Sequence, residues 1–256
     1  MSKYSDGEQH YYRDLDGKAY YDGPLVVLTS RLTASAAEIV AQSLQDYGVA
    51  LVVGDEQTYG KGTIQAQTIT EGDSSQYFKV TVGKYYTVSG VTPQVRGVKA
   101  DVLLPGEYSS LEVGEGYLEA PLGNDQVHAA FKDNLWDIEP QARAWYAQYY
   151  LPTLQAREQE WTAMLPLLRE RSGARLDTNK QYQLYLKNHG VDSRWKFGWS
   201  EEDVNMKNFD IEDFQVSEAA NIVRDMIALE ERMAGAAPQN QKADPLFYVG
   251  AERRKK

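Results

Sequence analysis

The sequence predicts an α/β fold followed by a mostly helical part. Residues 25–30 and 49–53 form two apolar runs, and the segment between them has helical spacing, which is the order of a βαβ unit. Aromatic and β-branched residues alternate in part over residues 76–88, a pattern that favours antiparallel strands. From about residue 124 onward the apolar spacing is helical.

The composition is that of a globular protein and excludes several classes of function. The chain has 256 residues, of which 42% are hydrophobic and 25% charged, enough for one large or two modest domains. A net charge of -10 argues against nucleic acid as a partner, because non-specific binding needs a basic face. The chain has no cysteine, and His10, His128 and His189 lack the spacing of a zinc site, so we expect no cofactor.

The first elements are predicted from turns and apolar runs. Residues 1–22 are polar and contain Asp-Gly pairs, and we expect a hairpin at Asp16-Gly17 because short aromatic runs flank that pair. This polar start lacks the apolar region of a signal peptide. Residues 25–30 and 49–53 are predicted to be buried strands.

A helix is predicted between these two strands. Ser35 precedes it and Glu38 follows three residues later, which is the pattern of a capping box. Gly48 is expected to end the helix. One apolar face is expected from the residues at helical spacing, Ala36, Ile39, Val40 and Leu44.

The later elements follow from similar patterns. Residues 76–88 predict one or two antiparallel strands broken at Gly83, and we expect residues 97–105 to close the same layer. Residues 139–173 predict helix that is interrupted or kinked near Pro152 and Pro166.

Another helix is predicted over residues 213–235. Its expected apolar face consists of Val216, Ala220, Val223, Met226 and Ile227. We therefore divide the chain into residues 1–22, 23–105, a linker at 106–123, a helical domain at 124–236 and a flexible tail at 237–256.

Ser35 is a candidate nucleophile. Its neighbours Ala34 and Ala36 are small, which leaves room for a substrate carbonyl group. Free N–H groups at a helix N-terminus favour the negative charge that develops during acyl transfer. The alternative is that Ser35 is only a helix cap, which is the more common role of serine at this position.

Lys61 is a candidate general base. It lies between Gly60 and Gly62, and glycines allow unusual backbone angles and close approach. A lysine acts as a base only in its neutral form, which burial favours. The alternative is a solvated lysine in a surface turn.

The same loop differs from a phosphate-binding loop. That motif would be G-x-x-x-x-G-K-[ST]. Here five residues separate Gly54 from Gly60, and Gly62 stands where the motif needs serine or threonine. We therefore reject nucleotide binding.

Gln65 and Asp46 are the remaining polar candidates. Gln65 can contact Lys61 only if the chain turns between them, because an extended strand would separate them by roughly 13 Å. Asp46 lies near the C-terminal end of the first helix, where an acid is mildly unfavourable, which indicates another reason for its presence. The alternative is that Asp46 is a surface carboxylate.

Residues 23–105 resemble the carboxy-terminal processing peptidases, especially the tail-specific protease branch. The segments that carry the resemblance are TASAAE, QDYG, GDEQTYGKGTIQ and GVKAD. The resemblance implies a partial serine protease core of the ββα type, followed by a helical C-terminal domain. By the same resemblance, residues 1–22 are expected to be the tail of an interrupted core, without the family's PDZ domain.

The resemblance also implies a role for each candidate residue. Ser35 corresponds to the nucleophile, Lys61 to the general base and Gln65 to the glutamine that orients the lysine. Asp46 corresponds to an aspartate important in the tail-specific branch, and the Ala36 N–H to an oxyanion-hole donor. The spacing from Ser35 to Lys61 is one residue longer than the family usually has.

The implied function is that of a serine endopeptidase. It would cleave proteins with apolar, unstructured C-termini through an acyl-enzyme, in the bacterial periplasm or cell envelope. The implied partners are protein or peptide substrates, and an adaptor or self-association stays open. The alternative is an inactive fragment that acts as a peptide-binding or scaffold module.

Overall fold

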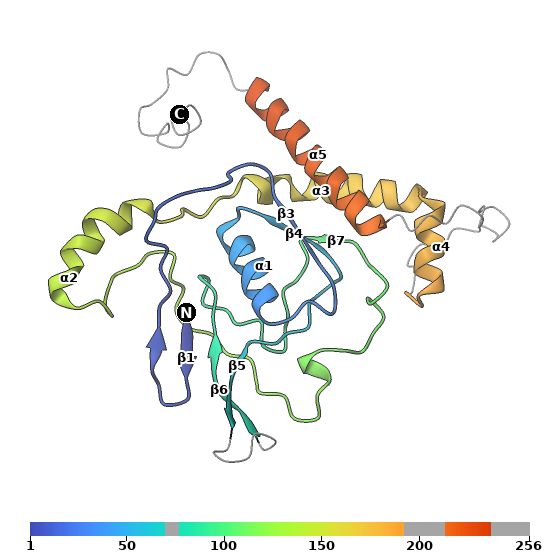
Figure 1. Ribbon diagram of the computed structural model, residues 1–256. Helices are drawn as coiled ribbons and strands as arrows, with labels where there is room; N and C mark the ends of the chain where they lie inside the picture. The colour runs from blue at the N-terminus through green and yellow to red at the C-terminus, as the bar shows by residue number, and fades with distance from the viewer. Residues whose placement is uncertain (70–76, 192–212, 237–256) are drawn as a thin grey trace.

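The computed structural model describes residues 1–69, 77–191 and 213–236 (Figure 1). Within these ranges the chain forms a parallel sheet, an antiparallel sheet and a set of helices, so the predicted α/β class is confirmed. The predicted flexible tail at 237–256 lies outside the described residues.

The parallel sheet has the order β3-β4-β7. Strands β3 (Val26–Thr29) and β4 (Leu51–Gly54) are joined by α1 (Ala36–Tyr47), so the predicted βαβ unit is confirmed. Strand β7 (Val102–Leu103) pairs with β4, with Val102 opposite Val53. The prediction that residues 97–105 close the antiparallel layer is therefore wrong, because this apolar segment instead buries Val102 in the core of the parallel sheet.

The antiparallel sheet has the order β2-β1-β6-β5. Its strands are β1 (Ser2–Tyr4), β2 (Gln9–His10), β5 (Thr63–Ile69) and β6 (Tyr77–Tyr85). The predicted antiparallel strand over residues 76–88 is confirmed as β6. The strand continues through Gly83 instead of breaking there. A glycine fits this position because β1 passes so closely that a Cβ at Gly83 would lie 2.5 Å from the Lys3 carbonyl oxygen.

The N-terminal hairpin lies at a different Asp-Gly pair from the predicted one. Strands β1 and β2 pair across Asp6-Gly7, where Gly7 has a φ of 92°. The predicted hairpin at Asp16-Gly17 is wrong, because no strand flanks that pair in the described structure. Both pairs carry the same turn signal, and pairing with β6 selects the first.

Helix α1 has the predicted ends but a different buried face. It ends at Gly48 in the left-handed conformation, with a φ of 72°. Ile39 and Val40 are 38% and 56% exposed, whereas Glu38 and Ala41 are fully buried. The predicted apolar face is thus largely exposed to solvent. The buried side of α1 instead carries Glu38, whose carboxylate accepts hydrogen bonds from neighbouring loops.

The helical part begins with a short, irregular stretch. Helix α2 (Pro140–Trp145) continues through a π-helical turn at Tyr146–Tyr150 and a 3-10 turn at Leu151–Thr153. The predicted interruption near Pro152 is confirmed. Pro166, in contrast, lies inside α3 (Glu160–Thr178).

Helices cover both faces of the parallel sheet (Figure 1). Val52 of β4 packs with Ala41 of α1 on one face. On the other face, Leu51 and Val53 join the core formed with α3, α4 (Lys180–Asn188) and α5 (Phe214–Ala236). The parallel sheet and the C-terminal helices therefore share one core, and their division into domains stays a prediction. No helix within the described ranges is long and apolar enough to cross a bilayer.

The position of α5 is confirmed, but its buried face is shifted from the predicted one. Ile222 and Met226 are fully buried, whereas Val216 and Ile227 are 54% and 42% exposed. The reason is Glu218, which faces the core and is paired with Arg175 of α3.

The ion pairs between α3 and α5 predict a loss of stability in acid. Asp225 accepts hydrogen bonds from Arg171 and Arg175, both at 2.7 Å. Burial alone would raise the pKa of Asp225, but these hydrogen bonds outweigh burial and the pKa is lowered. A lowered folded pKa gives stability that is present above the ordinary carboxyl pKa of about 3.9 and lost as the pH falls through the folded value.

Asp225→Asn is therefore expected to destabilise the chain by about 1 to 2 kcal/mol at pH 7. Urea unfolding over a pH series measures this difference. It should be constant from pH 7 to about 5 and shrink below about pH 4. A difference that does not change with pH would contradict the role of the Asp225 charge.

Candidate active site

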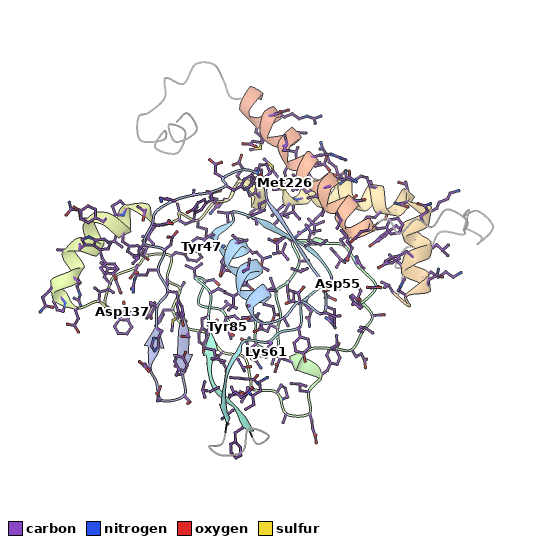
Figure 2. All side chains as sticks on the ribbon, in the orientation of Figure 1. Tyr47, Asp55, Lys61, Tyr85, Asp137 and Met226 are labelled. Carbon is purple, nitrogen blue, oxygen red and sulfur yellow. The ribbon has the colours of Figure 1, made fainter. Side chains whose placement is uncertain are left out.

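Ser35 and Lys61 lie beyond the carboxyl ends of two adjacent parallel strands. Ser35 follows β3 and Lys61 follows β4, and these strands pair directly. Loops at the carboxyl edge of a parallel sheet lie side by side and commonly form binding sites. Figure 2 shows Lys61 and Tyr85 near the end of α1 that lies away from Tyr47.

Ser35 occupies a strained turn between β3 and α1. Its φ is 57° and its ψ is -117°, a combination that a residue with a Cβ rarely adopts. Such strain persists only where surrounding contacts hold it, and it clusters at active sites. A strained strand-to-helix turn is also how hydrolases of the nucleophile-elbow type expose their serine. The Ala36 N–H, at the first position of α1, donates to no group among the described residues.

Glu38 holds the backbones of Ser35 and Lys61 together. Its side chain is fully buried. One carboxylate oxygen accepts the N–H groups of both Ser35 and Lys61, each at 2.8 Å. The other oxygen accepts the Gly60 N–H at 2.7 Å and the Thr58 hydroxyl. The capping-box pattern predicted the bond to Ser35, but not the three to the lysine loop.

Tyr85 of β6 makes a second connection between the same two residues. Its hydroxyl donates to the carbonyl oxygen of Ser35 at 3.0 Å and to that of Lys61 at 2.9 Å. Burial raises the pKa of Tyr85, and the nearby charge of Glu38 raises it further. Sequence reasoning missed Tyr85, because its partners are 50 and 24 residues away in the chain.

The glycines beside Lys61 allow backbone angles and close contacts that a residue with a Cβ would not, as the sequence predicted. Gly60 has a φ of 88°. A Cβ at Gly62 would lie 2.3 Å from the Thr92 hydroxyl oxygen. Gly62 also donates its N–H to the Gln94 side chain at 2.9 Å, and Gln94 is fully buried. The lysine loop is therefore fixed on both sides of Lys61.

The Lys61 amino group does not bond to Ser35 in this structure. Within the described chain, its one hydrogen bond goes to the Thr63 carbonyl oxygen at 3.4 Å. That distance is at the long end of the hydrogen-bond range. The structure thus brings the two backbones together without the Ser35–Lys61 side-chain bond, and such bonds often tighten only with substrate.

Gln65 makes no hydrogen bond to Lys61 within the described structure. It lies on the extended strand β5, and its side chain is exposed. In the part of the chain that the structure describes, neither side chain hydrogen bonds to the other. This agrees with the expectation that an extended strand would separate them.

Asp46 lies at the opposite end of α1 from Ser35. At 1.5 Å per residue, the 12 residues of α1 place the two ends roughly 16 Å apart. Asp46 is only 8% exposed, so the alternative that it is a surface carboxylate is wrong. It accepts the Thr87 hydroxyl at 2.5 Å, the Ser89 N–H at 3.1 Å and the Gln42 amide at 2.9 Å.

The described residues offer no metal site. Among them, no three or more histidine, cysteine, aspartate or glutamate side chains gather in an arrangement that could hold a metal ion.

The geometry is that of an α/β protein whose strained serine turn is tied to a lysine loop. Residues 1–104, about two fifths of the chain, match the model of peptidase family S41. The resemblance to carboxy-terminal processing and tail-specific proteases is confirmed for this part of the chain.

Individual proteins show the same similarity. The tail-specific protease of Haemophilus influenzae is 34% identical over 125 residues, which cover 46% of this chain and 18% of that protein. A carboxyl-terminal-processing protease of Picosynechococcus sp. is 43% identical over 91 residues, covering 36% of this chain and 21% of that protein.

Relatives with chloroplastic names also match. The chloroplastic C-terminal processing peptidase of Tetradesmus obliquus is 40% identical over 108 residues, covering 42% of this chain and 22% of that protein. Among solved structures, a photosystem II D1 C-terminal processing protease shares 41% identity with a TM-score of 0.29, over 32% of this chain and 20% of that chain. The chain spans about a fifth of the length of these curated relatives.

Proposed function

We propose that this chain carries the nucleophile and the general base of a serine endopeptidase. The observation that supports this most directly is that Ser35 and Lys61 share the same oxygen of Glu38 and the same hydroxyl of Tyr85. A catalytic pair must be held within a narrow range of geometry, and buried side chains that fix both backbones do this. A helix cap alone would not need a connection to the lysine loop.

The proposed reaction is acyl transfer with a neutral lysine as base. Lys61 takes the proton of the Ser35 hydroxyl as its oxygen attacks a peptide carbonyl carbon. The Ala36 N–H donates to the oxyanion. The proton passes from Lys61 to the leaving amine as the peptide bond breaks, and water then hydrolyses the acyl-enzyme with Lys61 again as base. The amino group of Lys61 must leave the Thr63 carbonyl oxygen to do this.

The proposed substrates are proteins with apolar, unstructured C-termini. Exposed apolar side chains lie within five residues of Ser35 in the sequence, with Leu32 at 44%, Ile39 at 38% and Val40 at 56%. An extended apolar peptide would bury these side chains on binding. The resemblance to the tail-specific branch supports the same substrate class, and a bacterial cell envelope as the compartment.

Lys61→Arg is the variant that tests the proposed base. Arginine keeps the charge but is never neutral near pH 7, so it cannot accept the serine proton. We expect kcat for cleavage of an unfolded protein with an apolar C-terminus to fall by roughly 10³-fold or more, as for Lys61→Ala. Lys99→Ala, which removes an exposed lysine, is the control and should cleave normally.

Activity in Lys61→Arg near that of the unchanged chain would overturn the role of Lys61 as base.

A second candidate function is a peptide-binding module without catalysis, which the Lys61–Thr63 hydrogen bond favours. It predicts that the unchanged chain binds the same substrate and leaves it intact.

A further inference from the structure

We propose that Tyr85 is a positioning residue that sets the nucleophile turn against the lysine loop, and that Asp46 supports it from the far end of α1. This inference rests on the proposed function. It concerns residues 85–89, which contact Ser35 at the start of α1 and Asp46 near its end.

Tyr85 is the second side chain, after Glu38, that hydrogen bonds to the backbones of both candidate residues. Ser35 and Lys61 each donate their N–H to Glu38, and the carbonyl oxygen of each accepts the Tyr85 hydroxyl. A single hydroxyl proton is shared between the two carbonyl oxygens, as in three-centre hydrogen bonds. Both of these side chains are buried: Glu38 is fully buried and Tyr85 is 7% exposed. Without Tyr85, the Ser35 carbonyl oxygen would keep only the N–H groups of Glu38 and Ile39 in its own helix, and no side chain would connect it to Lys61 through the carbonyl oxygens.

The backbone of Tyr85 reinforces this contact. Its N–H donates to the Gly62 carbonyl oxygen at 3.0 Å, next to Lys61. Strand β6 thus holds the lysine loop through both its main chain and a side chain. The hydroxyl touches backbone carbonyls and not the reacting side-chain atoms, so its role is positional. The raised pKa keeps the hydroxyl protonated, and it therefore remains a donor.

The same segment fixes the other end of α1. Two residues beyond Tyr85, Thr87 donates its hydroxyl to Asp46 at 2.5 Å, and the Ser89 N–H reaches the same oxygen at 3.1 Å. A helix held at both ends by one segment cannot tilt or slide independently of it. Asp46 can therefore influence Ser35 by placing the helix, although it lies too far away to exchange a proton with Ser35 or Lys61.

Tyr85→Phe is the main test, with Tyr86→Phe as a matched control. Tyr86 is the next residue, is 3% exposed, and directs its hydroxyl to Asp125 instead of the site. At a temperature where all forms are folded, Tyr85→Phe is expected to lower kcat roughly 10- to 100-fold with little change in KM. Tyr86→Phe should leave both constants unchanged. Equal kcat in the two variants would overturn the proposal.

A pH profile tests the part played by Asp46. If Asp46 only places α1, Asp46→Asn lowers kcat at every pH without moving the limbs of the profile. A shifted limb would mean that the carboxylate takes part in proton transfer, which overturns the positional role.

Hydrogen exchange keeps this inference separate from the proposed function. The amides of residues 35–38 and 60–62 should exchange faster in Tyr85→Phe and at the normal rate in Tyr86→Phe, whether or not the chain cleaves anything. If the chain without substitutions binds substrate but does not cleave it, the proposed function is overturned. Faster exchange in Tyr85→Phe would in that case still support the connection through Tyr85. Unchanged exchange in Tyr85→Phe would overturn that connection itself.

Discussion

Replacing Ser35 by alanine is expected to abolish cleavage, with kcat reduced by roughly 10³-fold or more. The hydroxyl is the proposed attacking group, and the neighbouring small residues cannot replace it. The measurement is cleavage of an unfolded protein with an apolar C-terminus. Ser43→Ala, which removes another hydroxyl from the same helix, is the control and should retain full activity.

A second substitution at Ser35 separates chemistry from backbone strain. Alanine carries a Cβ and keeps the strain of the 57° φ, whereas glycine adopts this conformation without it. We expect Ser35→Gly to be more stable to urea than Ser35→Ala by about 1 kcal/mol, while both are inactive. Activity in either variant would exclude Ser35 as the nucleophile. Equal stability would mean that the turn holds no strain.

Replacing Glu38 by alanine is expected to have the largest effect on stability, a loss of roughly 3 to 5 kcal/mol. Four donors would lose their acceptor inside the protein: the N–H groups of Ser35, Gly60 and Lys61, and the Thr58 hydroxyl. Cleavage should fall with it, even where the variant is still folded, because the two loops would separate. Urea unfolding and the cleavage assay measure the two effects.

Two controls accompany the Glu38 variant. Glu56→Ala removes an exposed acid and should change stability by less than about 0.5 kcal/mol. Glu38→Gln keeps the size of the side chain but turns one acceptor into a donor that faces other donors, so it should also be destabilised. A stable and active Glu38→Gln would show that the carboxylate does not organise the loops.

The sequence was informative where the interactions are local. The βαβ unit follows from two apolar runs around a helix, and the end of α1 at Gly48 follows from a glycine with a positive φ. The motif that contains Ser35 and Lys61 could be found because its residue types are unusual together. The position of α5 could be predicted from helical spacing, since such spacing needs no knowledge of partners.

The rest depends on contacts between distant residues. Glu38 looked like a helix cap because its bond to Ser35 is local, while its other partners are 20 to 23 residues away. Tyr85 is one aromatic residue among several in a strand pattern. The buried face of α5 includes Glu218, and only the presence of Arg175 on another helix makes a carboxylate acceptable there.

The core shared by the sheet and the C-terminal helices joins residues that are synthesised far apart in time. Strands β3 and β4 lead into the serine turn and the lysine loop, yet one face of their sheet is covered by Ile222 and Met226 of α5. The ribosome makes these residues more than 150 positions after the lysine loop. Until α5 emerges, the sheet lacks that cover and the two loops rest on an unfinished support. The support of the serine turn and the lysine loop is therefore complete only after the region through α5 has been translated.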